Sequence, residues 1–255
     1  MIRLLRAEWL KTKRGALRLL VFGVPVLCGA VLAWYISGRP WIAPGAAFSG
    51  FFSVWTVLVL PLALAIVAGQ LVQEEELAGA FHGLLLSGHA RALLYTVKLV
   101  LLLGAAALAT ALAIGSFLAG LGLGGYASGS VLLYVEAGLV AWLAAIPLAA
   151  CSLWISFAAG MGVAVGVGMG GMLIAALIGG TLIGDTIWPF VPWAWPVRLS
   201  HALAIVQTPG MDAALLTDFL RAAGEACVLT VFSSILLIVG GLCWFSRWDG
   251  RDAGE

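Results

Sequence analysis

The side chains that could do chemistry concentrate in one short stretch of the chain. It holds three consecutive glutamates, Glu74, Glu75 and Glu76, followed by His82 and His89. Carboxylates and imidazoles can ligate a metal or move protons, but zinc needs several ligands at close, regular spacing. Neither these two histidines nor His201 has such neighbours. We therefore expect no metal site.

Nucleotide chemistry and covalent catalysis also lack their motifs. No Gly-x-x-x-x-Gly-Lys-[Ser/Thr] phosphate loop occurs in the sequence, so the chain cannot cradle the phosphates of a nucleotide in the usual way. The apolar stretches hold no nucleophile beside a base and no cluster of His, Glu and Asp, which an intramembrane enzyme would need. The sequence thus predicts a protein that is not an enzyme and has no cofactor of its own.

The elements that position these residues are predicted to be membrane helices. Of the 255 residues, 63% are hydrophobic and only 10% are charged, and the mean hydropathy is +1.11. A soluble domain cannot hide that much apolar surface. The net charge of only +1 excludes the broad basic surface of a nucleic-acid-binding protein. We expect an all-α integral membrane protein.

Six mainly apolar runs are long enough to cross a bilayer, which takes about 20 helical residues. One stretch, residues 131–183, carries Glu136 as its single charge and is too long for one crossing, so a turn is expected near 156–160. The six predicted transmembrane helices cover residues 19–37, 51–72, 95–120, 131–156, 160–183 and 225–245.

The basic residues predict the orientation. Ten of the thirteen lysines and arginines fall before the first predicted span, at the connection between the second and third spans (Arg91 and, in the first turn of the third span, Lys98) or after the sixth. Basic residues stay preferentially in the cytoplasm, so both termini are expected there. The organisation predicted is an interface helix at 1–16 and a six-helix domain at 17–255, with a cytoplasmic loop at 73–94 and an extracellular segment at 185–222.

The N-terminal segment has the pattern of a helix lying in the inner membrane interface. Ile2, Leu5 and Trp9 share one helical face. Its polar side carries basic residues, namely Arg3, Arg6, Lys11 and Lys13. This helix is either an ordinary topology anchor or a surface whose polar face also meets a cytoplasmic partner.

The loop at 73–94 starts with acidic residues and ends with Arg91, a charge order that suits the dipole of a short helix. Its apolar residues, Leu77, Phe81, Leu84 and Leu85, recur at helical spacing. Such a stripe needs to be buried, either against the ends of the protein's own helices or in a groove of another subunit.

These features resemble a known family. The basic start ending in Glu-Trp-Leu-Lys-Thr-Lys-Arg, an early proline in the first span and the series Leu84, Ser87, Arg91, Tyr95 and Lys98 are similar to the permease subunits of ABC-2 type transporters. The likeness is greatest to the permeases of lantibiotic immunity and antimicrobial-peptide export. It covers the whole chain in topology and is specific over residues 1–100.

The resemblance implies a function and partners. The chain would be the transmembrane permease subunit of a bacterial exporter, in the plasma membrane, moving an antimicrobial peptide or another amphipathic molecule. ATP and Mg²⁺ would bind a separate ATPase subunit, in two copies, and a second permease, identical or homologous, would complete the pathway. The first cytoplasmic loop would form the coupling helix that docks on the ATPase. The implied interface residues are Glu74, Glu75, Glu76, Leu77, Phe81, His82, Leu85 and Arg91.

Small residues in the fifth predicted span suggest close helix packing. Gly162, Gly166 and Gly170 recur every four residues, and small residues one turn apart let helix backbones approach. The partner helix could belong to this chain's own bundle or to a second permease subunit.

The outer half of the protein offers candidates for a pathway or gate. Glu136 lies about one and a half turns inside the fourth span, where it either faces protein or water or reaches to the outer headgroups. Trp188, Trp193 and Trp195 cluster among prolines in the extracellular segment. Tryptophan favours the membrane interface, so short or re-entrant helices are expected here, serving as a plug or as a rim that contacts a peptide.

Two functions from other classes stay open. An ion-coupled secondary transporter usually has broken helices, charges near the midplane and repeated halves, and the predicted midplane here is almost free of charge. A membrane scaffold without transport is the other alternative, and a stable partner lacking ATPase activity would favour it.

Overall fold

The computed structural model describes residues 2–12, 17–79, 81–86, 88–206 and 213–250. Every regular element in these ranges is a helix, which confirms the all-α prediction. The α-helices are α1 (Ile2–Lys11), α2 (Val24–Ser37), α3 (Pro44–Ser53), α4 (Leu60–Leu77), α5 (His82–Leu85), α6 (Arg91–Leu123), α7 (Val131–Ala144), α8 (Ile146–Ile174), α9 (Trp195–Val206) and α10 (Ala213–Ser246). Three wider π-helical turns are η2 (Leu19–Gly23), η3 (Val54–Val59) and η4 (Ala175–Gly179), and three 3₁₀ turns are η5 (Leu182–Gly184), η6 (Trp188–Phe190) and η7 (Pro192–Ala194).

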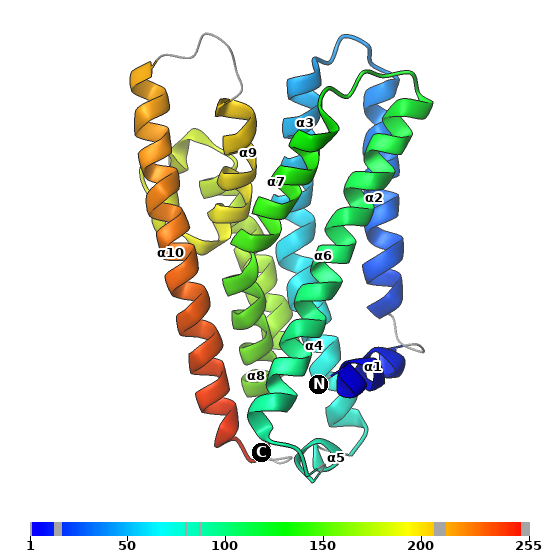
Figure 1. The fold of residues 1–255 in the computed structure, drawn as a ribbon, viewed down its shortest axis with the longest axis vertical. Helices are drawn as coiled ribbons and strands as arrows, with labels where there is room; N and C mark the ends of the chain where they lie inside the picture. The colour runs from blue at the N-terminus through cyan, green and yellow to red at the C-terminus, as the bar shows by residue number, and fades with distance from the viewer. Residues whose placement is uncertain (1, 13–16, 80, 87, 207–212, 251–255) are drawn as a thin grey trace.

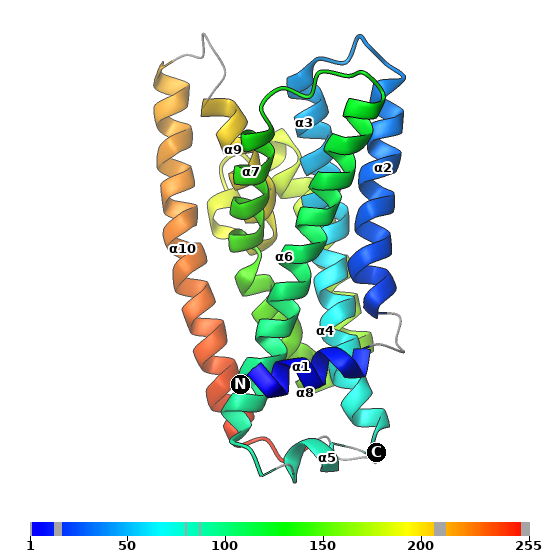
Figure 2. The same cartoon turned by 45° about the vertical axis from the view of Figure 1, so that its right-hand side comes forward.

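The long helices lie side by side along the long axis of the molecule (Figure 1). One end of the bundle carries α1, α5 and the last turns of α10, and we name it the lower end. The opposite, upper end carries the start of α10 and the outer part of α9. α1 lies across the other helix axes at the lower end (Figure 2).

Two of the π-helical turns have a proline two residues after their end. Pro25 comes just after η2, and Pro61 just after η3. Proline has no N–H, and its ring clashes with the carbonyl four residues earlier, so a wider turn accommodates it without breaking the helix. The chain therefore stays helical through both prolines, over Leu19–Ser37 and Pro44–Leu77.

Among the described residues, five helices are long and apolar enough to cross a membrane: Leu19–Ser37, Pro44–Leu77, Arg91–Leu123, Ile146–Gly179 and Leu216–Ser246. α7 is apolar as well, but it has 14 residues, fewer than the roughly 20 of a straight crossing. The six crossings and the side on which each terminus lies therefore stay predictions.

The chain reverses inside α8, at Gly160. Its φ of 88° and ψ of 172° are not helical and belong to a region that residues with a Cβ rarely enter. Before this glycine the chain runs beside α6, since the Tyr95 hydroxyl donates to the carbonyl of Ala150 over 3.5 Å. After it, Met161 lies against Gly69 of α4. Gly160 lies in the segment where the sequence predicts a turn.

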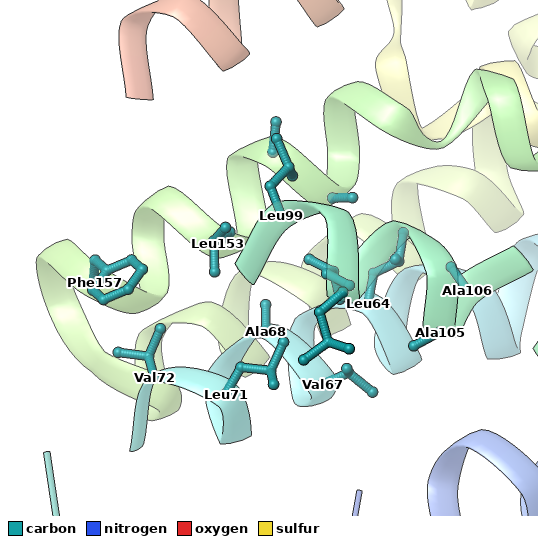
Figure 3. Packing of buried hydrophobic residues seen from close by; sticks show 14 of the residues in the cluster. Leu64, Val67, Ala68, Leu71, Val72, Leu99, Ala105, Ala106, Leu153 and Phe157 are labelled. Carbon is teal, nitrogen blue, oxygen red and sulfur yellow. The ribbon is translucent and has the colours of Figure 1, made fainter. Parts of the chain in front are cut away.

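The main core joins α4, α6 and α8 toward the lower end (Figure 3). Leu64, Ala68 and Leu71 of α4 pack there against Leu99 of α6 and Leu153 of α8. A second core nearer the upper end is aromatic and gathers residues of α3, α6 and α7. It includes Phe48, Phe51, Phe52, Phe117 and Tyr134. These two cores hold the helices that position the lower-end residues described below.

Short helices occupy the described residues between η4 and α10, and Trp193 among them reaches the main core. That this segment is extracellular stays a prediction. The turns η5, η6 and η7 lead from α8 into α9, which packs against α7, α3 and α10. η4, which packs against η7, also packs on η3, where Val57 meets Ala175. Arg198 of α9 donates to the carbonyls of Ile178 (3.3 Å) and Thr181 (2.6 Å), and so satisfies backbone groups freed where α8 ends.

Candidate functional site

A buried lysine joins three elements at the lower end. The side chain of Lys98, on α6, is only 2% exposed. Its Nζ lies 2.9 Å from Glu8 Oε2 on α1, 3.0 Å from Glu75 Oε1 on α4 and 3.1 Å from the carbonyl oxygen of Leu71. An ammonium group has three donors, so each finds an acceptor and the charge is fully partnered.

Lys11 completes this group. Its Nζ lies 2.6 Å from Glu8 Oε1 and 2.8 Å from Glu75 Oε1. Burial lowers the pKa of Lys11, but the hydrogen bonds to Glu75 and Glu8 outweigh it, and the pKa lies above its ordinary value. We name Glu8, Lys11, Glu75 and Lys98 the charge cluster. Two carboxylates face two ammonium groups, and such pairing is what allows charges to be buried.

The prediction that Glu74, Glu75 and Glu76 begin a short helix is wrong. These three residues lie in the last turns of α4, which continues to Leu77. The C-terminal end of a helix dipole disfavours carboxylates. Lys11 and Lys98 compensate Glu75 there, and Glu74 and Glu76 are partly exposed.

The predicted apolar stripe of the loop divides into a buried and an exposed part. Phe81 and Leu84 are buried against the protein's own helices, which is one of the two alternatives left open by the sequence. Leu77 is 79% exposed and Leu86 is 80% exposed. The side chain of Leu85 lies outside the described residues. The expectation of one continuous stripe is wrong because α5 is only a four-residue turn.

The predicted interface residues therefore do not share one surface. Glu75 and Phe81 point into the protein, whereas Leu77 and His82 are exposed. Arg91 is half-buried, and it binds the residues just after α10. Its guanidinium donates to the carbonyl of Trp248 over 2.7 Å and pairs with Asp249 over 2.9 Å. The loop is thus anchored to the bundle, and fewer of its residues are exposed than the sequence predicted for the interface.

The amphipathic pattern predicted for α1 matches its packing. Leu5 and Trp9 pack against the main core, and Arg3 and Arg6 are exposed. The Trp9 ring also lies 5.4 Å from the Arg18 guanidinium carbon, within the range of a cation–π contact. Lys13 lies outside the described residues.

The three tryptophans predicted at a gate lie mostly inside the protein. Trp188 and Trp195 are buried, and Trp193 is half-buried. The Trp195 indole donates to the carbonyl of Pro189 over 2.8 Å, and Trp188 stacks on Phe219 of α10. In this conformation they hold the turns between α8 and α9 together, and a role at a gate or rim stays a prediction.

A cavity of about 500 Å³ lies near the upper end, between α3, α7 and α9. Phe48 and Tyr134 give it an aromatic wall, while Ser49, Ser130 and His201 give it polar groups. Glu136 is half-buried on α7, one helical turn beyond Leu133, which also lines this cavity. The cavity offers both apolar and hydrogen-bonding surface.

The structure contradicts the alternative that the predicted glycine face packs inside this chain's own bundle. A Cβ added at Gly162, Gly166 or Gly170 would meet nothing within 4 Å. The close contacts fall instead on Gly168, whose added Cβ would lie 2.5 Å from Ala65 Cβ, and on Gly171, which packs against Trp193. The face of Gly162, Gly166 and Gly170 is open, so the alternative that it meets another subunit stays a prediction.

Lys98 and Glu8 are the functional candidates that sequence reasoning missed. Lys98 lies inside the predicted span 95–120, and a charge inside a span is itself a signal that a partner exists. That partner could not be read from spacing, because Glu8 and Lys98 are separated by 90 residues along the chain. Within the described part of the chain, no three His, Cys, Asp and Glu side chains are grouped to hold a metal.

The chain matches a known protein family. A family model described as ABC-2 family transporter protein matches residues 4–183, well over half of the chain. No curated protein and no solved structure matches it. The matched range contains the charge cluster, α5 and the reversal at Gly160.

Proposed function

Because this chain belongs to the ABC-2 transporter family, a family of multi-pass membrane proteins, we propose that it is the permease subunit of an ATP-driven exporter. A separate ATPase subunit, present in two copies, hydrolyses ATP with Mg²⁺ and drives it. The permease itself has no catalytic role. Its cargo is an amphipathic molecule, of which an antimicrobial peptide of the lantibiotic kind is the specific candidate, and its location is a bacterial plasma membrane.

The charge cluster is the observation that carries this proposal. It binds α1, the end of α4 and the base of α6 to one another through Glu8, Glu75 and Lys98. A force applied to the loop after α4 would therefore reach two long helices and α1 together. The exposed leucines Leu77 and Leu86 form the apolar part of the docking face for the ATPase. Large exposed apolar side chains outside the lipid commonly mark a protein contact.

The proposed orientation places the lower end in the cytoplasm. The basic residues of α1 and Arg91 lie there, in keeping with the positive-inside rule. An ATPase that uses cytoplasmic ATP would then dock on α5.

Six crossings are part of the proposal. The fourth crossing is α7 together with α8 as far as Gly160, and the fifth is the remainder of α8 with η4. The reversal at Gly160 supports this division, and residues 131–159 are long enough, at 1.5 Å per residue, for a hydrocarbon layer of about 30 Å.

A second permease completes the pathway in this proposal. The open face of Gly162, Gly166 and Gly170 supports it, because glycines in a membrane helix allow the close approach of another helix. The upper cavity, with its aromatic wall and its serines, suits an amphipathic cargo, which has apolar and hydrogen-bonding parts.

The test is purification of the tagged chain in mild detergent, with mass spectrometry of the bound proteins and an assay of ATP hydrolysis. The proposal expects a phosphate-loop ATPase to co-purify and its activity to respond to amphipathic peptides. A chain that purifies without an ATPase, and instead moves a solute with an ion gradient in proteoliposomes, would be a secondary transporter and the proposal would be wrong.

A further inference from the structure

Phe81 has a backbone conformation that its side chain disfavours. Its φ is 66° and its ψ is 0°, and among the described residues no other non-glycine has a positive φ. Its N–H donates to the carbonyl of Glu75 over 3.3 Å and so closes the end of α4. Phe81 comes just before α5, and glycine is the usual residue in left-handed backbone because it has no Cβ. A phenylalanine persists there only if its surroundings hold the ring firmly.

The ring of Phe81 is held by other aromatic rings. It is 1% exposed, and its centroid lies 5.0 Å from Trp248 and 6.5 Å from Phe157. Phe157 in turn lies 4.6 Å from Phe245 and 6.2 Å from Tyr95. These five residues, Phe81, Tyr95, Phe157, Phe245 and Trp248, form what we name the aromatic cluster.

The aromatic cluster links parts of the chain that are far apart in sequence. Phe81 comes from the loop after α4, Tyr95 from α6 and Phe245 from the end of α10. Phe157 lies three residues before the reversal at Gly160. Displacing Phe81 would therefore require Phe157 or the end of α10 to move as well, because close-packed interiors transmit a displacement instead of absorbing it.

We infer that Phe81 is a positioning residue that passes the movement of the ATPase-facing loop to the turn at Gly160 and to α10. The inference rests on the proposed function and adds to it a second path by which movement of the loop reaches the helices. The charge cluster carries a movement of the loop to α1 and α6, whereas Phe81 carries it to α10 and to the part of α8 that carries the open glycine face. The strained backbone fits this role, since such strain is often kept at switching segments.

The test is hydrogen–deuterium exchange of the complete complex in lipid nanodiscs, without nucleotide and with ATP, Mg²⁺ and vanadate. The readouts are exchange in residues 73–79, beside the ATPase, and in residues 161–174, beyond the turn. Three variants are compared with the original chain: Phe81→Leu, which keeps an apolar side chain without a ring, Phe157→Leu on the other side of the contact, and the control Phe190→Ala, an exposed ring in η6 that is outside the aromatic cluster.

The expected result is a nucleotide response at both segments in the original chain and in Phe190→Ala. In Phe81→Leu and Phe157→Leu the response should persist at 73–79 and be lost at 161–174, with unchanged exchange in α2 as evidence of folding. A response at both segments in the two leucine variants overturns the inference, as does an original chain that responds at 73–79 alone; in both cases the proposed function stands. No response at either segment in the original chain contradicts the proposed function and the inference together.

Discussion

The main-chain N–H of Phe81 donates to the carbonyl of Glu75 over 3.3 Å, while the Glu75 carboxylate accepts from Lys98 over 3.0 Å. A single residue at the end of α4 thus belongs to the charge cluster through its side chain and holds a member of the aromatic cluster through its backbone. A change to either cluster should therefore alter the structure at Glu75, where the loop begins.

Removing the buried ammonium should destabilise the protein strongly. Lys98→Met leaves Glu8 and Glu75 with Lys11 alone, and a buried pair that loses one member typically loses about 3–5 kcal/mol. Reversible unfolding in mixed micelles measures the change in free energy.

Two further variants make this measurement specific to Lys98. Lys11→Met removes a side chain that is 49% exposed, so its effect should be about 1 kcal/mol or less. The double variant Lys98→Met/Glu75→Leu should be more stable than Lys98→Met, because one uncompensated carboxylate is gone. Equal free energies of unfolding for Lys98→Met and the original chain would show that the charge cluster does not hold the fold.

Charging the exposed leucines of the loop should prevent docking of the ATPase without harming the fold. A leucine buried at an interface contributes about 1.5–3 kcal/mol, so Leu77→Glu and Leu86→Glu should each weaken co-purification by roughly tenfold or more. Quantitative mass spectrometry of the bound ATPase measures this. The matched control is Leu123→Glu, an exposed leucine at the other end of α6; if it lowers ATPase recovery equally, Leu77 and Leu86 are not the docking face.

The two glycine faces of α8 should respond oppositely to substitution. Gly168→Leu must displace Ala65 and should destabilise the chain, by about 1–3 kcal/mol for overpacking. Gly166→Leu meets open space and should unfold like the original chain, but it should reduce pairing of permeases, which cross-linking in membranes detects. Normal pairing in Gly166→Leu would rule out this face as the contact between permeases.

Labelling from one side of the membrane tests the six crossings. In a chain whose native cysteines are replaced by serine, Ser128→Cys should react with an impermeant maleimide added outside the cell. Ala159→Cys, beside the turn and exposed, should react after the cytoplasm is opened. If Ile146–Gly179 were one straight crossing, position 159 would lie within the lipid and would not react from either side.

The helices could be predicted from the sequence because their signal is local. Apolar runs define Leu19–Ser37 and most of the other long helices, and the excess length of 131–183 predicts a turn where Gly160 lies. Prediction failed where the answer depends on distant partners. Glu74 to Glu76 match the start of a helix by charge order, but they end one, since Glu75 is compensated by Lys11 from 64 residues earlier.

The candidate site could be predicted only in outline. A functional loop at 73–94 follows from its charges and from family resemblance, yet which of its residues face outward depends on the packing of Phe81 against Phe157 and Trp248. Likewise, the spacing of Gly162, Gly166 and Gly170 predicts a contact without telling whether the contact lies inside the chain. Both depend on how α8 turns back, which spacing alone does not specify.

The two packed π-helical turns, η3 and η4, have a consequence for tolerance to deletion. Each holds one residue more than an α-helical turn of the same height, and Val57 and Ala175 place them in contact. Loss of one residue within Val54–Val59 or within Ala175–Gly179 can therefore be absorbed as ordinary α-helix, with the flanking residues keeping their faces. Elsewhere in these helices the same loss would rotate everything beyond it by about 100°. The middle of the bundle thus contains two places where the length of the chain can change by one residue while the lower end keeps its register.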